Sequence, residues 1–349
     1  MTQLLRRTDP SYLVLTGLAV ALTVLPFFLS GANLEVAIRI LLFGMLSTAW
    51  NVMAGYAGLF SFGHAAYFGL GAYSGAYLLV EHGLSPWIGM AVGMVLGGAF
   101  AAVTGFLSFR YKLTGAYFVL TTFAFAEMLR LIALNLDLVN RAVGFRVPIV
   151  REPTIWDLQF APGSRGYYYV VMGMLLVTLF ATIYLMRSRS GYFIVALRDN
   201  EEAAASLGIN PLRYKLLAVT FSGALTAAGG TFFFQFLFFI DPPIAFGPAI
   251  SIEILLPAIV GGMGTMWGPL VGSVLLIPLS EFTSSLVRSP PAALGFLQGR
   301  SGVDLMIFGG LLMATIIFLP KGVYGTIVDR LSVARARKRG SERQSEDAS

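Results

Sequence analysis

Polar side chains inside this strongly apolar chain are concentrated in residues 51–77. The stretch contains six glycines together with Asn51, Ser61 and His64. Amide, hydroxyl and imidazole groups at these positions can hydrogen-bond backbone or a passing solute, but they do not form a catalytic set. Irregular backbone is tolerated at membrane depth only where protein or a water-filled cavity surrounds it. The stretch therefore predicts a break in a helix bundle and favours transport over catalysis.

A second glycine-rich interruption, residues 261–272, lies in the other half of the chain. Paired interruptions in two halves indicate a solute path near the membrane midplane. The pairing is one element out of register, because the first break falls between predicted spans two and three and the second between spans eight and nine. Close helix packing is the alternative explanation for the glycines. The residues predicted to line the path are Asn51, Ser61, Gly63, His64, Gly71, Glu127 and Gly262.

The composition is that of a membrane protein. Of the 349 residues, 56% are hydrophobic and 12% are charged, whereas a soluble domain carries about 25% charged residues. Without cysteine the chain forms no disulfide and no Cys-ligated metal site. The sequence has no phosphate-binding loop, no HExxH motif and no paired-carboxylate arrangement, so we expect no cofactor, no metal and no enzymatic activity. The net charge of +6 comes from loop ends and the tail, so nucleic acid is not an expected partner.

A spanning helix needs about 20 mostly apolar residues, and ten segments are candidates. The expected fold is an all-α polytopic membrane bundle with glycine-rich breaks and one cytoplasmic helix. The eighth segment is too short to cross without tilting or re-entering. The ten segments are Tyr12–Leu29, Val36–Met53, Ala65–Val80, Pro86–Phe109, Gly115–Leu136, Tyr167–Met186, Leu216–Ile240, Ile250–Met263, Trp267–Leu286 and Val303–Leu319.

Basic residues predict the orientation, because Lys and Arg are retained on the cytoplasmic side. With ten spans and a cytoplasmic N-terminus, most of them fall inside, and both termini are then cytoplasmic. Residues 1–330 form the expected permease domain, and residues 331–349 are expected to be a basic, disordered cytoplasmic tail in contact with lipid. The inner positions are Arg6, Arg7, Arg110, Lys112, Arg187, Arg189, Arg198, Arg213, Lys215 and the basic residues of 321–343.

Charged residues inside spans are costly and mark functional candidates. Glu127 and Arg130 are three residues apart on one helical face, which allows them to pair with each other. Arg39 is expected to extend its side chain toward the membrane surface. Glu253 opens the eighth span, and Glu281 near the end of the ninth is expected to be exposed or to cap its helix.

The loop between the sixth and seventh spans contains a predicted short helix. Asp199 or Asn200 is the expected N-cap, acidic residues and an alanine run follow, and Gly208 closes the helix. Asn210 and Pro211 are expected to prevent the helix from resuming. The apolar residues that flank this helix would hold it parallel to the membrane.

The same loop carries the pattern EAAxxxG, formed by Glu202, Ala203, Ala204 and Gly208. It resembles the loop by which permeases of ABC importers dock on their ATP-hydrolysing subunits. Three stretches resemble the LivM/LivH-type permeases for branched-chain amino acids: GYAGLFSFGHAAYFGLGAYSGAY, SGYFIVALRDNEEAAASLGINPLRYKLLAVTFSGALTAAGG and IEILLPAIVGGMGTMWGPLVGS. The segment KLTGAYFVLTTFAFAEMLRL is similar to LivM in particular. The resemblance covers most of residues 36–319.

One departure from the family pattern concerns the large outer loop, residues 137–166. Such permeases commonly carry a TGGxxG stretch at its start, whereas this chain has VNRAVGFRVPIV, with Gly144 retained between Arg141 and Arg146. A solute-binding protein would dock at this loop, so the departure leaves the solute open.

The resemblance implies a permease subunit that imports branched-chain or other hydrophobic amino acids, or a related small solute, across a bacterial-type cytoplasmic membrane. The implied partners are ABC ATP-binding subunits, a LivH-like second permease or a second copy of this chain, an extracytoplasmic solute-binding protein and membrane lipid. The alternative function is an ion-coupled secondary transporter that uses Glu127 or Glu253. A membrane-embedded enzyme is a third possibility, and the lack of a clustered His/Asp/Glu set argues against it.

Overall fold

The protein is an all-α, multi-pass membrane protein. The computed structural model describes residues 10–29, 31–150, 154–161, 164–288, 306, 309–310, 313, 317 and 322–326. Within this part of the chain, seven helical segments are long and apolar enough to cross a membrane. Much of the tenth predicted span and all of the basic tail lie outside the described residues.

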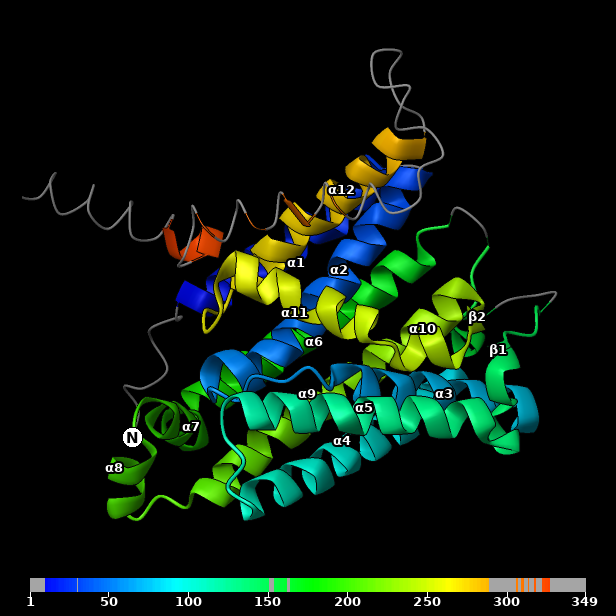
Figure 1. The fold of residues 1–349 in the computed structure, drawn as a ribbon. Coiled ribbons are helices and arrows are strands. Elements are labelled where there is room, and N and C mark those ends of the chain that lie inside the picture. Colours follow the sequence, from blue (N-terminus) through cyan, green and yellow to red (C-terminus); the bar gives the residue numbers. More distant parts are fainter. Residues whose placement is uncertain are drawn as a thin grey trace, which may run out of the picture.

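Twelve helices are described between residues 10 and 288 (Figure 1). They are α1 Pro10–Val24, α2 Ala32–Asn51, α3 His64–His82, α4 Pro86–Arg110, α5 Ala116–Asn135, α6 Gly166–Arg187, α7 Arg189–Asp199, α8 Glu201–Ser206, α9 Pro211–Leu237, α10 Pro242–Phe246, α11 Pro248–Gly262 and α12 Gly268–Arg288. Short helical turns accompany them: η1 Leu25–Phe27, the π-helical η2 Val52–Tyr56, η3 Asp137–Val139, η4 Arg141–Val143 and η5 Ile155–Asp157. Strands β1 Phe145–Arg146 and β2 Phe239–Ile240 pair antiparallel.

The first nine predicted spans each coincide with a helix, and the total of ten is not confirmed. The eighth differs most, because α11 begins at Pro248 and the short helix α10 directly precedes it. Asp241 caps α10 by accepting a hydrogen bond of 2.8 Å from the backbone N–H of Ile244. Together α10 and α11 form a candidate span of 21 residues. The short eighth segment is therefore lengthened by a second helix.

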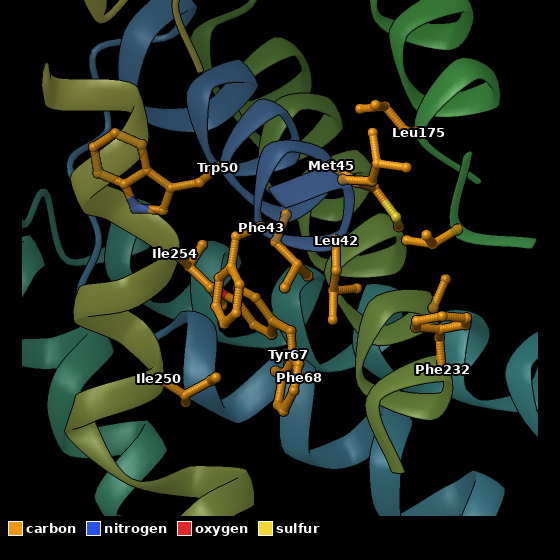
Figure 2. Close-up of a cluster of buried hydrophobic side chains, with 14 of the residues drawn as sticks. Leu42, Phe43, Met45, Trp50, Tyr67, Phe68, Leu175, Phe232, Ile250 and Ile254 are labelled. Atoms are coloured by element: carbon orange, nitrogen blue, oxygen red, sulfur yellow. The ribbon is translucent and has the colours of Figure 1, made fainter. Parts of the chain in front are cut away.

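Helix α2 lies at the centre of the bundle and is the most buried of the seven candidate spans, whereas α5 is the least buried. Helix α2 packs against α6, α9, α11 and α12. Figure 2 shows Leu42 and Trp50 of α2 in one cluster with side chains of α3, α6, α9 and α11. Tyr67, Phe232 and Ile254 belong to the same fully or almost fully buried cluster. Because transmembrane helices associate through close van der Waals packing rather than through removal of apolar area from water, this cluster fixes α2 relative to the helices that surround it.

Loops and short elements separate into two ends of the bundle (Figure 1). Helices α7 and α8 lie together at one end, and β1 and β2 lie at the other. The prediction of one short helix in the loop between α6 and α9 was incomplete, because the apolar flank before it also forms a helix, α7. Ser188 caps α7 by accepting a hydrogen bond of 3.4 Å from the backbone N–H of Gly191.

Candidate translocation site

The first glycine-rich break begins where α2 changes from α-helical to π-helical hydrogen bonding, at η2. A hydrogen bond of 3.0 Å from the backbone N–H of Leu59 to the carbonyl of Met53 continues the turn. The indole N–H of Trp50 donates to the carbonyl of Ser61 at 2.9 Å, and the Ser61 hydroxyl accepts from the N–H of Gly63 at 3.1 Å. Protein groups therefore satisfy much of the backbone of this break, as its depth in the bundle requires.

Asn51 joins the first break to the second. Its side-chain Nδ2 donates to the carbonyl of Thr265 at 2.9 Å, and its Oδ1 accepts from the backbone N–H of Gly264 at 2.8 Å. Asn51 is 1% exposed, so both hydrogen bonds are shielded from water. Gly262 and Gly264 have positive φ angles of 129° and 76° in this turn, a conformation that glycine adopts without steric cost. The two breaks, one element out of register in the sequence, are in direct contact.

His64 begins α3 and is completely buried. Its Nε2 lies 2.8 Å from the hydroxyl oxygen of Ser222 on α9, and its ring packs edge-on against Tyr67. The adjacent backbone N–H of Ala65 donates to the hydroxyl of Ser251 on α11 at 2.9 Å. Ser251 thus caps the N-terminus of α3 from another helix, because Gly63 at the N-cap has no side chain that could do so.

Gly63 and Gly71 lie where backbones approach each other closely. A Cβ at Gly71 would be 1.8 Å from the carbonyl oxygen of Ala227 on α9, and one at Gly63 would be 2.4 Å from the carbonyl oxygen of Thr122 on α5. Real Cβ atoms do not approach backbone this closely. Both glycines therefore permit tight helix packing, and a role on the solute path remains a prediction for them.

Glu127 and Arg130 form the ion pair that the sequence predicts. The guanidinium donates through Nε at 2.9 Å and through Nη2 at 2.5 Å to the two carboxylate oxygens. Two parallel hydrogen bonds hold both side chains in one orientation. The pair lies on α5, whose Thr122 hydroxyl accepts a hydrogen bond of 3.3 Å from the backbone N–H of Phe62 in the first break.

Arg39 and Glu281, which the sequence analysis treated separately, form an ion pair with each other. Arg39 of α2 donates to the carboxylate of Glu281 on α12, and each side chain is a little over one third exposed. Glu253 of α11 interacts electrostatically with both groups. A pair between residues so far apart in sequence cannot be recognised from either helix alone, and pairing lowers the cost of placing both charges within spans.

Helix α8 has the caps that the sequence predicts. The side-chain oxygen of Asn200 accepts a hydrogen bond of 3.0 Å from the backbone N–H of Ala203. At the other end Gly208 has φ 85°, and its N–H donates to the carbonyl of Ala205 at 2.9 Å. Ile209 donates to Ala204 at 3.2 Å, which completes a Schellman motif. Asn210 and Pro211 end this segment as predicted, but they also begin α9 at once as its N-cap and first residue.

The family model described as the branched-chain amino acid transport system permease component matches residues 33–316. The chain belongs to this family. It is 26% identical to the high-affinity branched-chain amino acid transport system permease protein LivM of Salmonella typhimurium, over 95% of this chain and 79% of that protein. A probable LivH permease of Methanocaldococcus jannaschii is also 26% identical, over 76% and 82% of the respective chains. The tyrosine transport system permease protein of Clostridioides difficile is 24% identical, over 49% and 54%. No solved structure gives a significant match.

The loop between α5 and α6 of this permease retains a structural use for Gly144. Its φ is 71°, and a Cβ there would be 2.0 Å from the carbonyl oxygen of Ile240 in β2. The side-chain amide of Asn140 donates to the Gly144 carbonyl at 2.7 Å. Arg141 pairs with Asp137 at 2.6 Å, and Arg146 lies over the ring of Phe239. The glycine thus lets the loop dock against β2.

Cavities of the described part lie at both ends of the permease. A cleft of about 680 Å³ separates the turn between α4 and α5 from α8 and the start of α9, with Lys112, Glu202 and Lys215 on its wall. At the end that carries β1 and β2, a cavity of about 520 Å³ is lined by Glu35, Gln159, Tyr167 and mostly apolar neighbours. The buried residues Asn51, Ser61 and His64 line neither of these cavities.

Several residues of the permease site were not singled out from the sequence. Ser222 and Thr265 bond the predicted residues His64 and Asn51 from another helix and a loop, and Ser251 bonds the backbone of Ala65 next to His64. Serine and threonine are common in membrane helices, so their type gives little signal without the contact. From the sequence, Arg198 was assigned only to the basic inner loop. Its contact with the carbonyl of Gly55 joins distant segments and is seen only in the structure.

Proposed function

We propose that this chain is the membrane-spanning permease subunit of an ATP-driven importer, with ATP hydrolysed by a separate subunit that docks on α8. The observation that carries the proposal is the capped helix α8 at one end of the bundle. A six-residue helix is too short to be stable alone, yet both of its ends are capped here. A loop that only connects α7 to α9 needs no capped helix, whereas a surface that binds another subunit needs a fixed conformation.

The exposure of α8 supports docking. Among Glu201–Ser206 only Ala204 is buried, and it faces the permease. Leu207, directly after the helix, is 83% exposed. An exposed large apolar side chain beside two acidic residues of the first turn provides an anchor with a polar rim, as in protein interfaces.

The proposed solute is a branched-chain or other hydrophobic amino acid, or a related small carboxylate. Relatives are named for branched-chain amino acids and for tyrosine. We place the path past the two glycine-rich breaks, along Asn51, Ser61, His64 and their predicted neighbours. Because these side chains are buried in the structure, passage requires the breaks to move apart, and ATP hydrolysis would supply the energy for that motion.

The remaining partners follow from the same proposal. A LivH-like permease or a second copy of this chain would complete the transmembrane unit, and a solute-binding protein would deliver solute at the end that carries β1 and β2. Lipid would surround the apolar outer faces. We further propose that both termini, α7 and α8 lie on the cytoplasmic side of a bacterial-type inner membrane, an orientation that the charge distribution favours.

The test uses the permease co-expressed with its ATP-binding subunits. Gly208→Val forces a β-branched residue into a positive φ, and Glu202→Lys places a cation at the N-terminus of α8, which costs about 0.3–1 kcal/mol directly. Both variants should insert normally but lose the ATPase on purification, and ATP-dependent uptake with it. Gly83→Val is the matched control, because Gly83 also has a positive φ with open space around it but follows α3. Normal ATPase retention by both α8 variants would refute the docking role.

A further inference from the structure

Arg198 occupies the junction between the loop helices and the membrane breaks. It lies in the last turn of α7, separated from α8 by only two residues. Its Nη1 donates to the carbonyl oxygen of Gly55 in η2 at 3.0 Å. Its Nε and Nη2 donate to the carboxylate of Asp199 at 3.0 and 2.8 Å. One guanidinium therefore holds the end of α7 against the π-helical turn that follows α2.

The geometry around Arg198 is close on more than one side. Its Cγ would be 2.9 Å from a Cβ at Gly58, and its Nη1 would be 3.5 Å from a Cβ at Gly264. Gly55 itself has no room for a side chain, because a Cβ there would be 2.0 Å from Oδ1 of Asn51. Glycine at position 58 therefore lets the arginine approach the first break, and glycine at position 55 leaves room for the side chain of Asn51.

The contacts continue from Arg198 through both breaks. Gly55 lies one turn after Asn51, and Asn51 holds Gly264 and Thr265 through two hydrogen bonds. These hydrogen bonds link three segments that are distant in the sequence: the end of α7, the turn η2 and the loop between α11 and α12. A movement of α7 would be carried to both breaks through hydrogen bonds rather than through flexible loop.

A second connection binds α8 elsewhere. Lys215 of α9 donates to the carboxylate of Glu201 at 2.6 Å, and the Lys215 side chain is 12% exposed while that of Glu201 is 45% exposed. This pair fixes α8 to the start of α9, and both residues line a cavity of about 240 Å³ together with Ala57 and Gly58 of the first break. Among the hydrogen bonds and ion pairs of α7 and α8 in the described part, the one that reaches the backbone of η2 is made by Arg198. Ile194 of α7 also belongs to one buried apolar cluster with Val52 and Ala57.

We propose that Arg198 is a positioning residue that transmits the motion of α8 to the two glycine-rich breaks. The proposal rests on the function proposed above, because it requires an ATPase that moves α8. The arginine acts through the backbone of Gly55 and does not touch solute. Its two hydrogen bonds to one carboxylate oxygen of Asp199 keep the guanidinium oriented, so that a displacement of α7 pulls on η2.

The experiment compares Arg198→Ala and Arg198→Lys with Arg189→Ala in the complete complex reconstituted in vesicles. Arg189 is exposed at the start of the same helix, so Arg189→Ala removes one positive charge from α7, as Arg198→Ala does. Assembly, basal ATPase activity and uptake of radiolabelled leucine per ATP hydrolysed are measured separately. Arg198→Ala should assemble and hydrolyse ATP but lower uptake per ATP about tenfold, the scale of one lost charge-assisted hydrogen bond. The uptake per ATP of Arg198→Lys should lie between that of Arg198→Ala and that of the wild type, since lysine keeps the charge but not the forked geometry.

The outcomes separate the two proposals. Equal uptake per ATP in Arg198→Ala, Arg189→Ala and the wild type would refute transmission through Arg198 while leaving ATP-driven import intact. Failure of both Arg198 variants to assemble would also refute it, because the residue would then be structural only. If the wild-type complex itself shows no ATP-dependent uptake of leucine or of other hydrophobic amino acids, the proposed function fails instead.

Discussion

Asn51 and Thr265, 214 positions apart in the chain, are joined by a hydrogen bond of 2.9 Å from amide to backbone carbonyl. With the bond from Gly264 to Asn51, it turns two separate interruptions of the bundle into one joined structure. Interrupted helices in membrane proteins require their freed backbone groups to be satisfied by protein or enclosed water. Here each break helps to satisfy the other, so neither can move without affecting its neighbour.

Replacing Asn51 by leucine should separate the breaks. Leucine has a similar size but cannot bond Gly264 or Thr265, and each buried group left unsatisfied costs about 1–3 kcal/mol. We expect a lower unfolding temperature in detergent and reduced uptake. Asn135→Leu is the control, because Asn135 is exposed and bonds only within α5. If both variants unfold at the wild-type temperature, the bridge does not stabilise the bundle.

Gly71→Ala tests the packing of α3 on α9. The new Cβ would overlap the carbonyl of Ala227, and such overpacking costs about 1–3 kcal/mol or more. We expect poorer accumulation in the membrane and lower thermal stability. Gly173→Ala on α6 adds the same methyl group where nothing lies within 4 Å, so its stability should match the wild type. Equal behaviour of the two variants would show that α3 and α9 can move apart freely.

Local signals in the sequence were sufficient for most helices and for α8. The signals for α8 lie within a few residues of one another: the N-cap Asn200, the alanine run and Gly208. Asn200 and Gly208 both form capping hydrogen bonds with this alanine run. Apolar length likewise located nine helices, and seven helical segments of the described part are long and apolar enough to span a membrane. These features depend on backbone geometry and side-chain type alone, so no distant contact had to be known.

Contacts between distant segments were not predictable in the same way. The pairing of Arg39 with Glu281 and the cap that Ser251 gives to α3 depend on how α2, α11 and α12 are arranged. The contact between the two breaks also contradicts simple repeat arithmetic, which placed them one element out of register. Only the three-dimensional packing around α2 brings these residues together.

A disulfide can test whether the joint at Arg198 stays closed during transport. The Cβ of Arg198 is 3.6 Å from a Cβ built at Gly58, within the range of about 3.5–4.5 Å for disulfides. The chain has no cysteine, so Gly58→Cys with Arg198→Cys introduces the only pair. We expect oxidation to cross-link them and to raise uptake per ATP above that of the same variant when reduced.

Comparing one variant in two redox states cancels any strain from the positive φ of Gly58. Arg198→Cys alone should respond to neither oxidant nor reductant, which controls for effects on the partner subunits. A loss of uptake on cross-linking would mean that α7 must separate from η2 in each cycle, contrary to transmission through a closed joint.

The source of energy is tested at Glu127. A secondary carrier needs a carboxylate that binds the coupling ion where solute binds, but both oxygens of Glu127 are occupied by Arg130. Glu127→Gln should leave Arg130 without its charged partner and lower stability by up to about 1 kcal/mol, because both side chains are partly exposed, and Glu127→Gln with Arg130→Gln should recover part of that loss. In reconstituted vesicles, uptake by both variants should still require ATP and the binding protein and should survive collapse of the proton gradient. Uptake by the wild type that needs no ATP and disappears with an uncoupler would instead identify a carrier, because an ATP-driven importer draws no energy from that gradient.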